Sequence, residues 1–176
     1  MHFDHYSIRF LELADTEAYF KLIDTNRNRL VDYFAGTVSR THTLEATREF
    51  IGERIKKRDD KVYLPYVIMD DESNAIIGFI DIKNIDWRVP KGELGCYLDE
   101  KYAGKGIAKK AFNLFIDYCF NELKFNKLFL RTHETNTPAR KLAEQCGFEV
   151  EGKIRKDHIT TAGQIIDLLY YGKIKS

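Results

Sequence analysis

A short glycine-containing segment carries the residues with the clearest capacity for chemistry. It spans residues 99–108, reads DEKYAGKGIA, and lies between an apolar run and a helical pattern. Gly104 and Gly106 allow sharp backbone turns, and the first turn of the next helix leaves N–H groups without intrahelical partners. Those donors and the positive end of the helix dipole favour a phosphate group. Lys105, Lys109 and Lys110 add positive charge, so the segment is predicted to bind an anion.

Two common nucleotide-binding motifs do not fit this segment. A Walker A loop needs a Ser or Thr directly after its Gly-Lys pair, to reach a magnesium ion, and here Gly104-Lys105 is followed by Gly106. A dinucleotide-binding loop needs a third glycine where this chain has Lys109. The phosphate ligand is therefore expected to belong to a different class of cofactor.

Hydrophobic periodicity indicates which elements hold the segment. Residues 92–98 read as a strand that enters the turn, and residues 109–122 place apolar side chains three and four positions apart, as a helix packed on a sheet does. Residues 127–133 read as the next strand. Because a helix joins these two strands, we expect them to run parallel.

The remaining segments complete one mixed α/β domain over residues 1–176. Further strands are expected at 6–12, 62–69, 75–85, 148–154 and 165–173. Pro65 indicates an edge strand or a bulge. Helices are expected after the N-cap Asp15, over 44–60 and from Asn136 to Gly147, with a short helical turn that ends at Gly36. The loop between the last two strands is expected to hold Asp157.

Composition narrows the functional classes. The formal net charge is +1, so no nucleic-acid partner is implied. No apolar run is long enough for a membrane helix and the N-terminal residues lack the apolar core of a signal peptide, so we expect a cytoplasmic protein without membrane attachment. The three cysteines share no metal-ligand spacing and are expected to be reduced core residues, and no metal site is expected.

Two spaced motifs resemble the GNAT acetyltransferases. The pattern Gln or Arg, two residues, Gly, one residue, then Gly or Ala fits residues 103–108, except that Ala103 stands at the Gln or Arg position. Residues 136–148, NTPARKLAEQCGF, followed by Glu151-Gly152 and a later Asp167, resemble the Rim branch of that superfamily. That branch includes ribosomal-protein N-terminal acetyltransferases.

The resemblance implies a fold, a cofactor and its contacts. It implies a mostly antiparallel sheet, flanked by helices, in which the parallel pair splays apart and the pantetheine arm of acetyl-CoA lies in the gap. Backbone groups of Cys96, Tyr97 and Leu98 would bind that arm. The pyrophosphate would lie on Ala103, Gly104, Lys105, Gly106, Ile107 and Ala108. Asn136 would contact the cofactor, and Arg140 and Lys141 would either bind the adenosine phosphate or form a solvated helix face.

The implied reaction needs a neutral amine. A protein N-terminal amine has a pKa near 7.7–8.0 and a lysine near 10.4, so the N-terminal amine needs only a modest base. Candidate bases are Glu93, Asp157 and His158. Glu93 is alternatively a structural strand residue, and His158 an exposed loop histidine. The general acid is missing, because Ala139 and Ala143 stand where relatives carry Ser or Tyr. A thiolate of pKa near 8.5 leaves without one.

Three functions remain open from the sequence. The first is acetylation of a protein N-terminus, with a ribosomal protein that starts with Ser or Ala as the leading acceptor. The second is acetylation of a small amine, such as a polyamine or an aminoglycoside. The third is a catalytically idle acyl-CoA-binding sensor. A homodimer is expected from the family alone.

Overall fold

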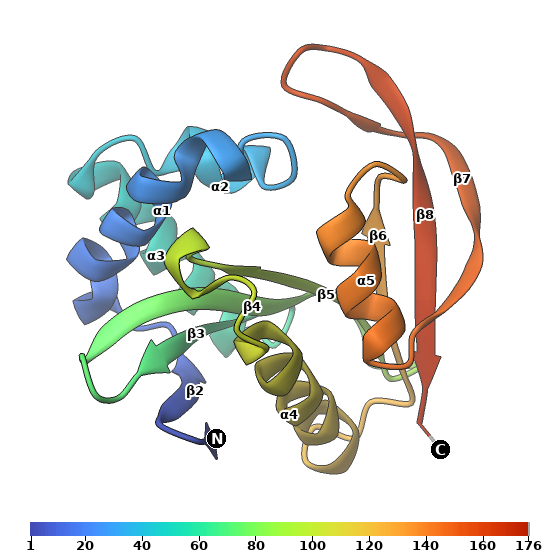
Figure 1. Cartoon of the computed structure of the whole chain (residues 1–176), viewed down its shortest axis with the longest axis horizontal. Helices are drawn as coiled ribbons and strands as arrows, with labels where there is room; N and C mark the ends of the chain where they lie inside the picture. The colour runs from blue at the N-terminus through green and yellow to red at the C-terminus, as the bar shows by residue number, and fades with distance from the viewer. Residues whose placement is uncertain (176) are drawn as a thin grey trace.

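One eight-stranded sheet forms the centre of the molecule, with helices on both faces (Figure 1). The computed structural model describes residues 1–175. The strands are β1 (His2–Phe3), β2 (Tyr6–Phe10), β3 (Leu64–Asp70), β4 (Ala75–Asp86), β5 (Lys91–Leu98), β6 (Lys127–Thr132), β7 (Glu149–Ile159) and β8 (Ile165–Ile174). The helices are α1 (Thr16–Leu30), α2 (Ala35–Arg40), α3 (Leu44–Asp59), α4 (Ile107–Asn121) and α5 (Thr137–Gln145), with short 3₁₀ turns η1 (Leu13–Asp15) and η2 (Glu100–Tyr102). Within residues 1–175, no helix combines the length and apolar character needed to cross a bilayer.

The strand order is β1-β2-β3-β4-β5-β6-β8-β7, and every neighbouring pair is antiparallel except β5 and β6. That parallel pair is held by three register pairs only, from Lys91 opposite Lys127 to Glu93 opposite Phe129. Beyond Glu93, β5 stays paired with β4 as far as Leu98, while β6 stays paired with β8. The sheet therefore opens into a wedge between β5 and β6, as the sequence resemblance implied.

Two hydrophobic cores cover the two faces of the sheet. Helices α4 and α5 pack on one face, around Phe112, Phe115 and Leu94. Helices α1 and α3 pack on the other face, around Tyr19, Phe50 and Phe79. Figure 1 shows these groups on either side of β3, β4 and β5, with β6, β7 and β8 beyond the wedge. The core on the α4 and α5 face includes Leu94 from β5 and Leu128 from β6, so it continues across the base of the wedge.

The helical boundaries near the N-terminus differ from the sequence expectation. Helix α1 continues to Leu30, and a second helix, α2, begins at Ala35, so Gly36 lies inside a helix and does not end one. The polar side chains of residues 24–29 obscured the periodicity there. Asn26 and Arg27 are polar, yet they make tertiary hydrogen bonds on the inner side of α1.

Two strand assignments also need correction. Pro65 lies in β3, an interior strand, and its missing N–H is tolerated because pairing with β2 starts only at the next residue, Tyr66. A bulge does occur in β3, but between Ile68 and Met69. Strand β7 extends to Ile159 and thus includes Asp157, which the sequence placed in a loop.

Replacing Phe115 with Ala tests the core on the α4 face. Phe115 is fully buried, and removal of its ring is expected to lower the free energy of unfolding by about 3–5 kcal/mol through lost burial and a residual cavity. Leu44→Ala is the matched control, because Leu44 is also helical but 47% exposed, and a change of at most about 0.5 kcal/mol is expected there. Urea denaturation measures both. Equal losses in the two variants would contradict the assigned core.

Candidate active site

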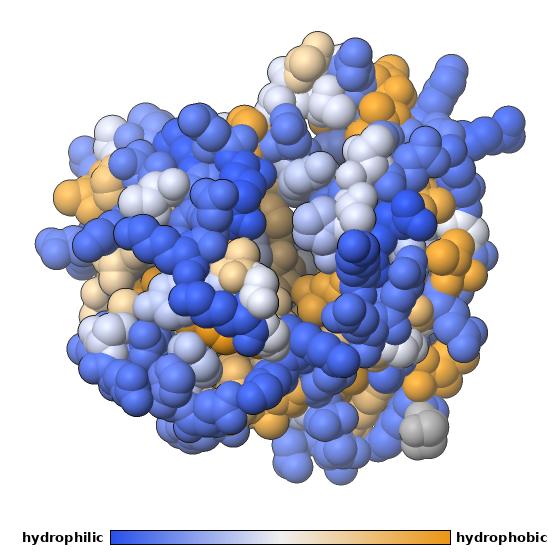
Figure 2. Space-filling model, in the orientation of Figure 1, coloured by the Kyte–Doolittle hydropathy of each residue, from blue (hydrophilic) through white to orange (hydrophobic). Residues whose placement is uncertain are grey.

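A cavity of about 470 Å³ lies where β5 and β6 separate. Figure 2 shows the surface hollowed between the two halves of the molecule, with apolar side chains at its base. One side of the cavity is lined from α4 and α5 by Phe112, Leu142 and Ala143. The other side is lined by the turn between α1 and α2, by Glu93 and Arg131, and by the β7–β8 hairpin. The cavity thus connects the two faces of the sheet.

The glycine turn has the geometry expected of an anion site. Gly104 and Gly106 have φ values of +75° and +77°, which side chains other than glycine rarely adopt. A Cβ at either position would meet no atom within 4 Å, so the turn is open to solvent. Gly106 is the N-cap of α4, and the N–H groups of Ile107, Ala108 and Lys109 have no intrahelical acceptor.

The lysines around the turn are not equally available. Lys110 forms an ion pair with Asp4, at 2.7 Å between Nζ and Oδ2. Lys105 lies over the ring of Tyr102, with Nζ 5.3 Å from the ring centroid. Lys109 is exposed next to the turn. Two of the three predicted cations, Lys105 and Lys109, therefore remain without a carboxylate partner among residues 1–175.

The three predicted contact residues of β5 differ in their surroundings. Cys96 lines the cavity, and burial raises the pKa of its thiol to about 12, so the thiol stays protonated at neutral pH. Tyr97 points to the α1 face, where its hydroxyl lies 2.8 Å from that of Tyr19. The carbonyl of Leu98 accepts a hydrogen bond from Arg29. Of the three, Cys96 is the one directly at the open edge.

The predicted cofactor contacts at α5 also differ in whether their side chains already have partners within the fold. Asn136 lines the cavity, and its Oδ1 caps α5 by accepting from an N–H of the first turn at 3.3 Å. Arg140 is already used within the fold, because its Nε donates to the Tyr171 hydroxyl at 3.2 Å and its Nη1 to the Glu134 carbonyl at 3.0 Å. Lys141 is exposed. The structure therefore leaves Lys141, rather than Arg140, free to meet a ligand phosphate.

Arg131 joins two of the three predicted bases. Its Nη2 donates to Glu93 Oε2 at 3.0 Å and its Nη1 to Asp157 Oδ2 at 2.8 Å. Glu93 is buried and also accepts from Asn84 at 2.6 Å, with Lys83 Nζ at 3.6 Å. Burial acts to lower the pKa of Arg131, but the two carboxylates outweigh it and raise that pKa. Both carboxylates are thus already engaged by cations.

The sequence analysis did not single out Arg131. The available signal was a cation inside the otherwise apolar strand LFLRT at residues 128–132, which faces the cavity rather than solvent. His158, the third predicted base, lies on β7 opposite Ile166, is half-buried and lines the cavity. Within residues 1–175, its ring makes no hydrogen bond, so its nitrogens are available to a substrate.

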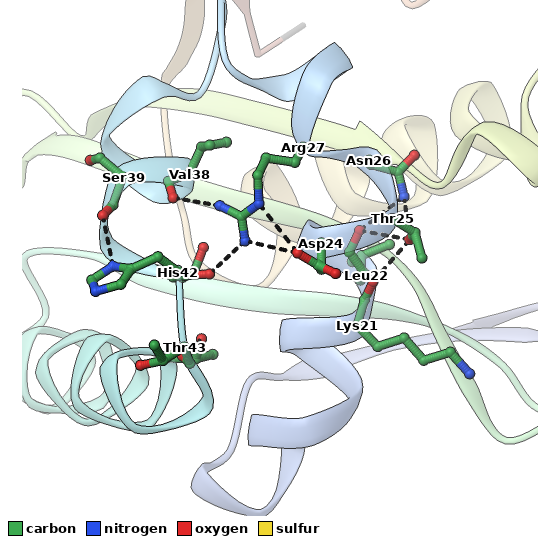
Figure 3. A network of polar contacts seen from close by, with 12 residues as sticks. Lys21, Leu22, Asp24, Thr25, Asn26, Arg27, Val38, Ser39, His42 and Thr43 are labelled. Carbon is green, nitrogen blue, oxygen red and sulfur yellow. Dashed lines mark hydrogen bonds and ion pairs between the residues drawn. The ribbon is translucent and has the colours of Figure 1, made fainter.

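A polar network fixes the wall formed by the α1–α2 turn (Figure 3). Arg27 donates from Nη1 to the Val38 carbonyl at 2.9 Å and from Nη2 to the Thr41 carbonyl at 2.8 Å, and it also contacts Asp24. The arginine thereby ties the C-terminal end of α2 to α1. This holds in place the turn that presents Tyr33 and Phe34 to the cavity.

Comparisons with known proteins agree with this geometry. The acetyltransferase (GNAT) domain family matches residues 6–149. YdaF of Bacillus subtilis (strain 168), a candidate ribosomal N-acetyltransferase, is 32% identical over 174 residues, which cover 98% of this chain and 92% of that protein. The spermidine N(1)-acetyltransferase of Vibrio cholerae is 25% identical, covering 84% of this chain and 81% of that protein.

Solved structures show the same fold. The ribosomal-protein-S5-alanine acetyltransferase from Vibrio fischeri superposes with a TM-score of 0.90 at 24% identity, covering 99% of this chain and 95% of that one. RimL, a ribosomal L7/L12 alpha-N-protein acetyltransferase solved with coenzyme A, has a TM-score of 0.90 at 17% identity, covering 98% and 95%. With the open wedge, the glycine turn and these matches together, the chain belongs to the GNAT family and is an acetyl-CoA-dependent N-acetyltransferase.

Proposed function

We propose that this enzyme acetylates the N-terminal α-amine of a protein, with a ribosomal protein that starts with Ser or Ala as the leading acceptor. The proposal rests on how the carboxylates are paired on one side of the cavity, which is formed by the α1–α2 turn, Glu93, Arg131 and the β7–β8 hairpin. We place the acceptor on this side. Glu93 and Asp157 share Arg131, and Lys83 also faces Glu93. A site built for a polycation is expected to offer unpaired carboxylates, and these two are already neutralised.

Acetylation of a polyamine is the second candidate. It is supported by the similarity to the Vibrio cholerae spermidine enzyme and by Asp32, an exposed carboxylate at the cavity rim. A single exposed carboxylate binds a polycation weakly, because solvent screens it. The higher identity and coverage of the match to YdaF, together with the paired carboxylates, favour a protein N-terminus.

The arrangement of the cavity fits acetyl-CoA as donor. The open turn at Gly104 and Gly106 and the free N–H groups of α4 suit the pyrophosphate, with Lys105 and Lys109 adding positive charge. The unpaired edge of β5 beyond Glu93 suits the extended pantetheine arm, which would pair with it much as a strand does. When bound, acetyl-CoA supplies the acetyl group to be transferred.

The acceptor amine needs a group that takes its proton. Because the Glu93 and Asp157 oxygens are engaged by Arg131, His158 is the most accessible of the three candidates. Imidazole has an ordinary pKa of about 6.5, close enough to that of an N-terminal amine for proton transfer near neutral pH. We infer that His158 is the general base, acting directly or through one water molecule.

Thiol release from acetyl-CoA, measured with separate pools of acceptors, tests the proposed function. The pools are short peptides with free N-termini, polyamines and aminoglycosides. The fastest release is expected with peptides that start with Ser or Ala, and N-acetylated copies of the same peptides serve as the control because they lack the nucleophile. Faster release with spermidine than with any peptide would replace the proposal by the polyamine alternative. Binding of acetyl-CoA without release from any pool would favour the idle sensor.

Gly106→Ala tests the pyrophosphate site. The Cβ forces a side chain into a positive φ at the N-cap of α4, so the turn must shift, and we expect acetyl-CoA affinity to fall about tenfold or more. Gly163→Ala is the matched control, because Gly163 has a similar φ of +79° and equally open surroundings but lies in the β7–β8 turn. Titration calorimetry measures both. Equal affinities in the two variants would exclude the turn as the binding site.

Substitution of the candidate bases tests the catalytic assignment. His158→Ala is expected to lower kcat about 100-fold or more while leaving acetyl-CoA affinity unchanged, because it removes proton transfer only. His133→Ala is the matched control, since His133 also lines the cavity but its Nδ1 already lies 2.7 Å from Thr135 Oγ1. Steady-state kinetics at several pH values measure the effect. A loss with Glu93→Gln and none with His158→Ala would reassign the base to Glu93.

A further inference from the structure

Thr132 places an unused hydroxyl in the cavity. It is the last residue of β6, lines the cavity and is only 7% exposed. Its Oγ1 makes no hydrogen bond within residues 1–175, and the protein does not completely cover that oxygen. The other two threonines of the cavity use their hydroxyls within the fold, because Thr135 Oγ1 lies 2.7 Å from the His133 ring and Thr160 Oγ1 accepts from the Gln164 N–H at 3.2 Å. The Thr132 hydroxyl is therefore free to donate to a ligand.

Strand alternation places Thr132 on the α4 and α5 face of the sheet. Residues two apart on a strand share a face, so Thr132 shares its face with Leu128 and Leu130, which belong to the core beneath these helices. Its register partner on β8 is Leu169, which packs against the same core. The proposed pyrophosphate turn ends at Gly106, the N-cap of α4, so acetyl-CoA is expected to approach on this face.

The proposed base lies on the opposite face of the sheet. His158 is the register partner of Ile166 on β8, and Ile166 is three residues from Leu169, the partner of Thr132. An odd separation along a strand means opposite faces, so His158 and Thr132 project to opposite sides of the sheet. Both nevertheless line the one cavity that crosses the wedge. An amine that gives its proton to His158 thus approaches from one face, while the departing group lies toward the other.

The wall around Thr132 disfavours a thiolate. It consists of side chains that have no hydrogen-bond donor, namely Phe112, Leu130, Ala139, Leu142 and Ala143. Cys96 lines the same cavity from β5, and burial raises the pKa of its thiol to about 12. A sulfur that departs as a thiolate in such surroundings needs a donor, and Thr132 supplies a free hydroxyl there.

We propose that the Thr132 hydroxyl donates a hydrogen bond to the sulfur of acetyl-CoA and stabilises the thiolate as it leaves. The amine nitrogen forms a bond to the carbonyl carbon, and the carbon–sulfur bond breaks with its electron pair remaining on sulfur. The amine proton goes to His158, and Thr132 keeps its own proton while donating the hydrogen bond. This inference rests on acetyl transfer from acetyl-CoA, whichever amine is the acceptor.

The ionisation of bound coenzyme A tests this hydrogen bond without any acceptor. A donor to the thiolate lowers the pKa of the bound thiol, and Thr132→Val keeps the shape of the side chain but removes the donor. The pKa of the bound thiol is therefore expected to be higher in Thr132→Val than in the unaltered enzyme, by about one unit or more. Nuclear magnetic resonance of saturating coenzyme A, labelled at the carbon next to sulfur and titrated with base, measures it. Equal pKa values in the two proteins would overturn the proposal.

Further variants separate the hydroxyl from the shape of the side chain. Thr132→Ser keeps the hydroxyl and should restore the thiol pKa of the unaltered enzyme, whereas Thr132→Ala should raise that pKa even if Thr132→Val folds poorly. Tyr33→Phe is the control, because within residues 1–175 the Tyr33 hydroxyl also lines the cavity without a partner, but on the α1–α2 turn. It should leave the thiol pKa unchanged. A raised pKa in Thr132→Ser, or in Tyr33→Phe, would contradict the assignment to the Thr132 hydroxyl.

Steady-state kinetics test the same hydrogen bond during turnover. Because the negative charge develops on sulfur only as the bond breaks, Thr132→Val is expected to lower kcat about tenfold or more. The KM for acetyl-CoA should stay within about threefold, since the ground state loses little. The rise in Tm with acetyl-CoA checks that the variant is folded. A higher KM with unchanged kcat would show that Thr132 acts only in binding, and the proposal would be wrong.

These outcomes are distinct from those that test the proposed acceptor. If the unaltered enzyme prefers a polyamine, the N-terminal function fails, but Thr132→Val still raises the pKa of the bound thiol if the inference holds. If peptides are the fastest acceptors and the thiol pKa does not change in Thr132→Val, the proposed function stands and the inference fails.

Discussion

The separation of β5 and β6 is the constraint on which the rest of the structure depends. Three register pairs hold the two strands together, and beyond Glu93 they diverge because each is paired more extensively with its other neighbour. The backbone groups along the outer edge of β5 are consequently left without a strand partner, and they need one from a ligand or from water. One of the two cores includes residues from both sides of the gap, such as Leu94 on β5 and Leu128 on β6, and so holds the two halves together. The cavity of about 470 Å³ lies in this gap.

Arg131 stabilises two carboxylates, Glu93 and Asp157, at the closed end of this wedge. It comes from β6, and its two carboxylate partners come from β5 and β7, so a single guanidinium links three strands at the point where they part. Glu93 is only 3% exposed, and a buried carboxylate without a cation would cost about 3–5 kcal/mol. Together with Lys83, which faces Glu93, Arg131 balances the charge of these two carboxylates. The packing of the wedge and the proposed preference for a protein N-terminus thus rest on the same interaction.

Asp81 is the exception to this pattern of paired carboxylates. Its neighbours satisfy one oxygen and leave the other beside Gly95, whereas Glu93 is surrounded by donors on both oxygens. Buried polar groups without partners are concentrated at functional sites, since folding alone selects against them. The cavity itself is lined by the half-buried imidazole of His158 and by Glu93, which Arg131 engages, while Asp81 lies buried behind the cavity wall.

The sequence by itself determined the features that depend on residues close together along the chain. The sharp turn at Gly104 and Gly106, the helix that follows it and the parallel relation of β5 and β6 were all predicted, because glycine spacing and helical periodicity act over a few residues. Only the tertiary structure decided which polar groups meet. Arg131 and Glu93 are 38 residues apart, and the contact of Asp81 with Gly95 depends on strand register. A shift of one residue in register would turn each of these side chains to the opposite face, and no local pattern specifies that choice.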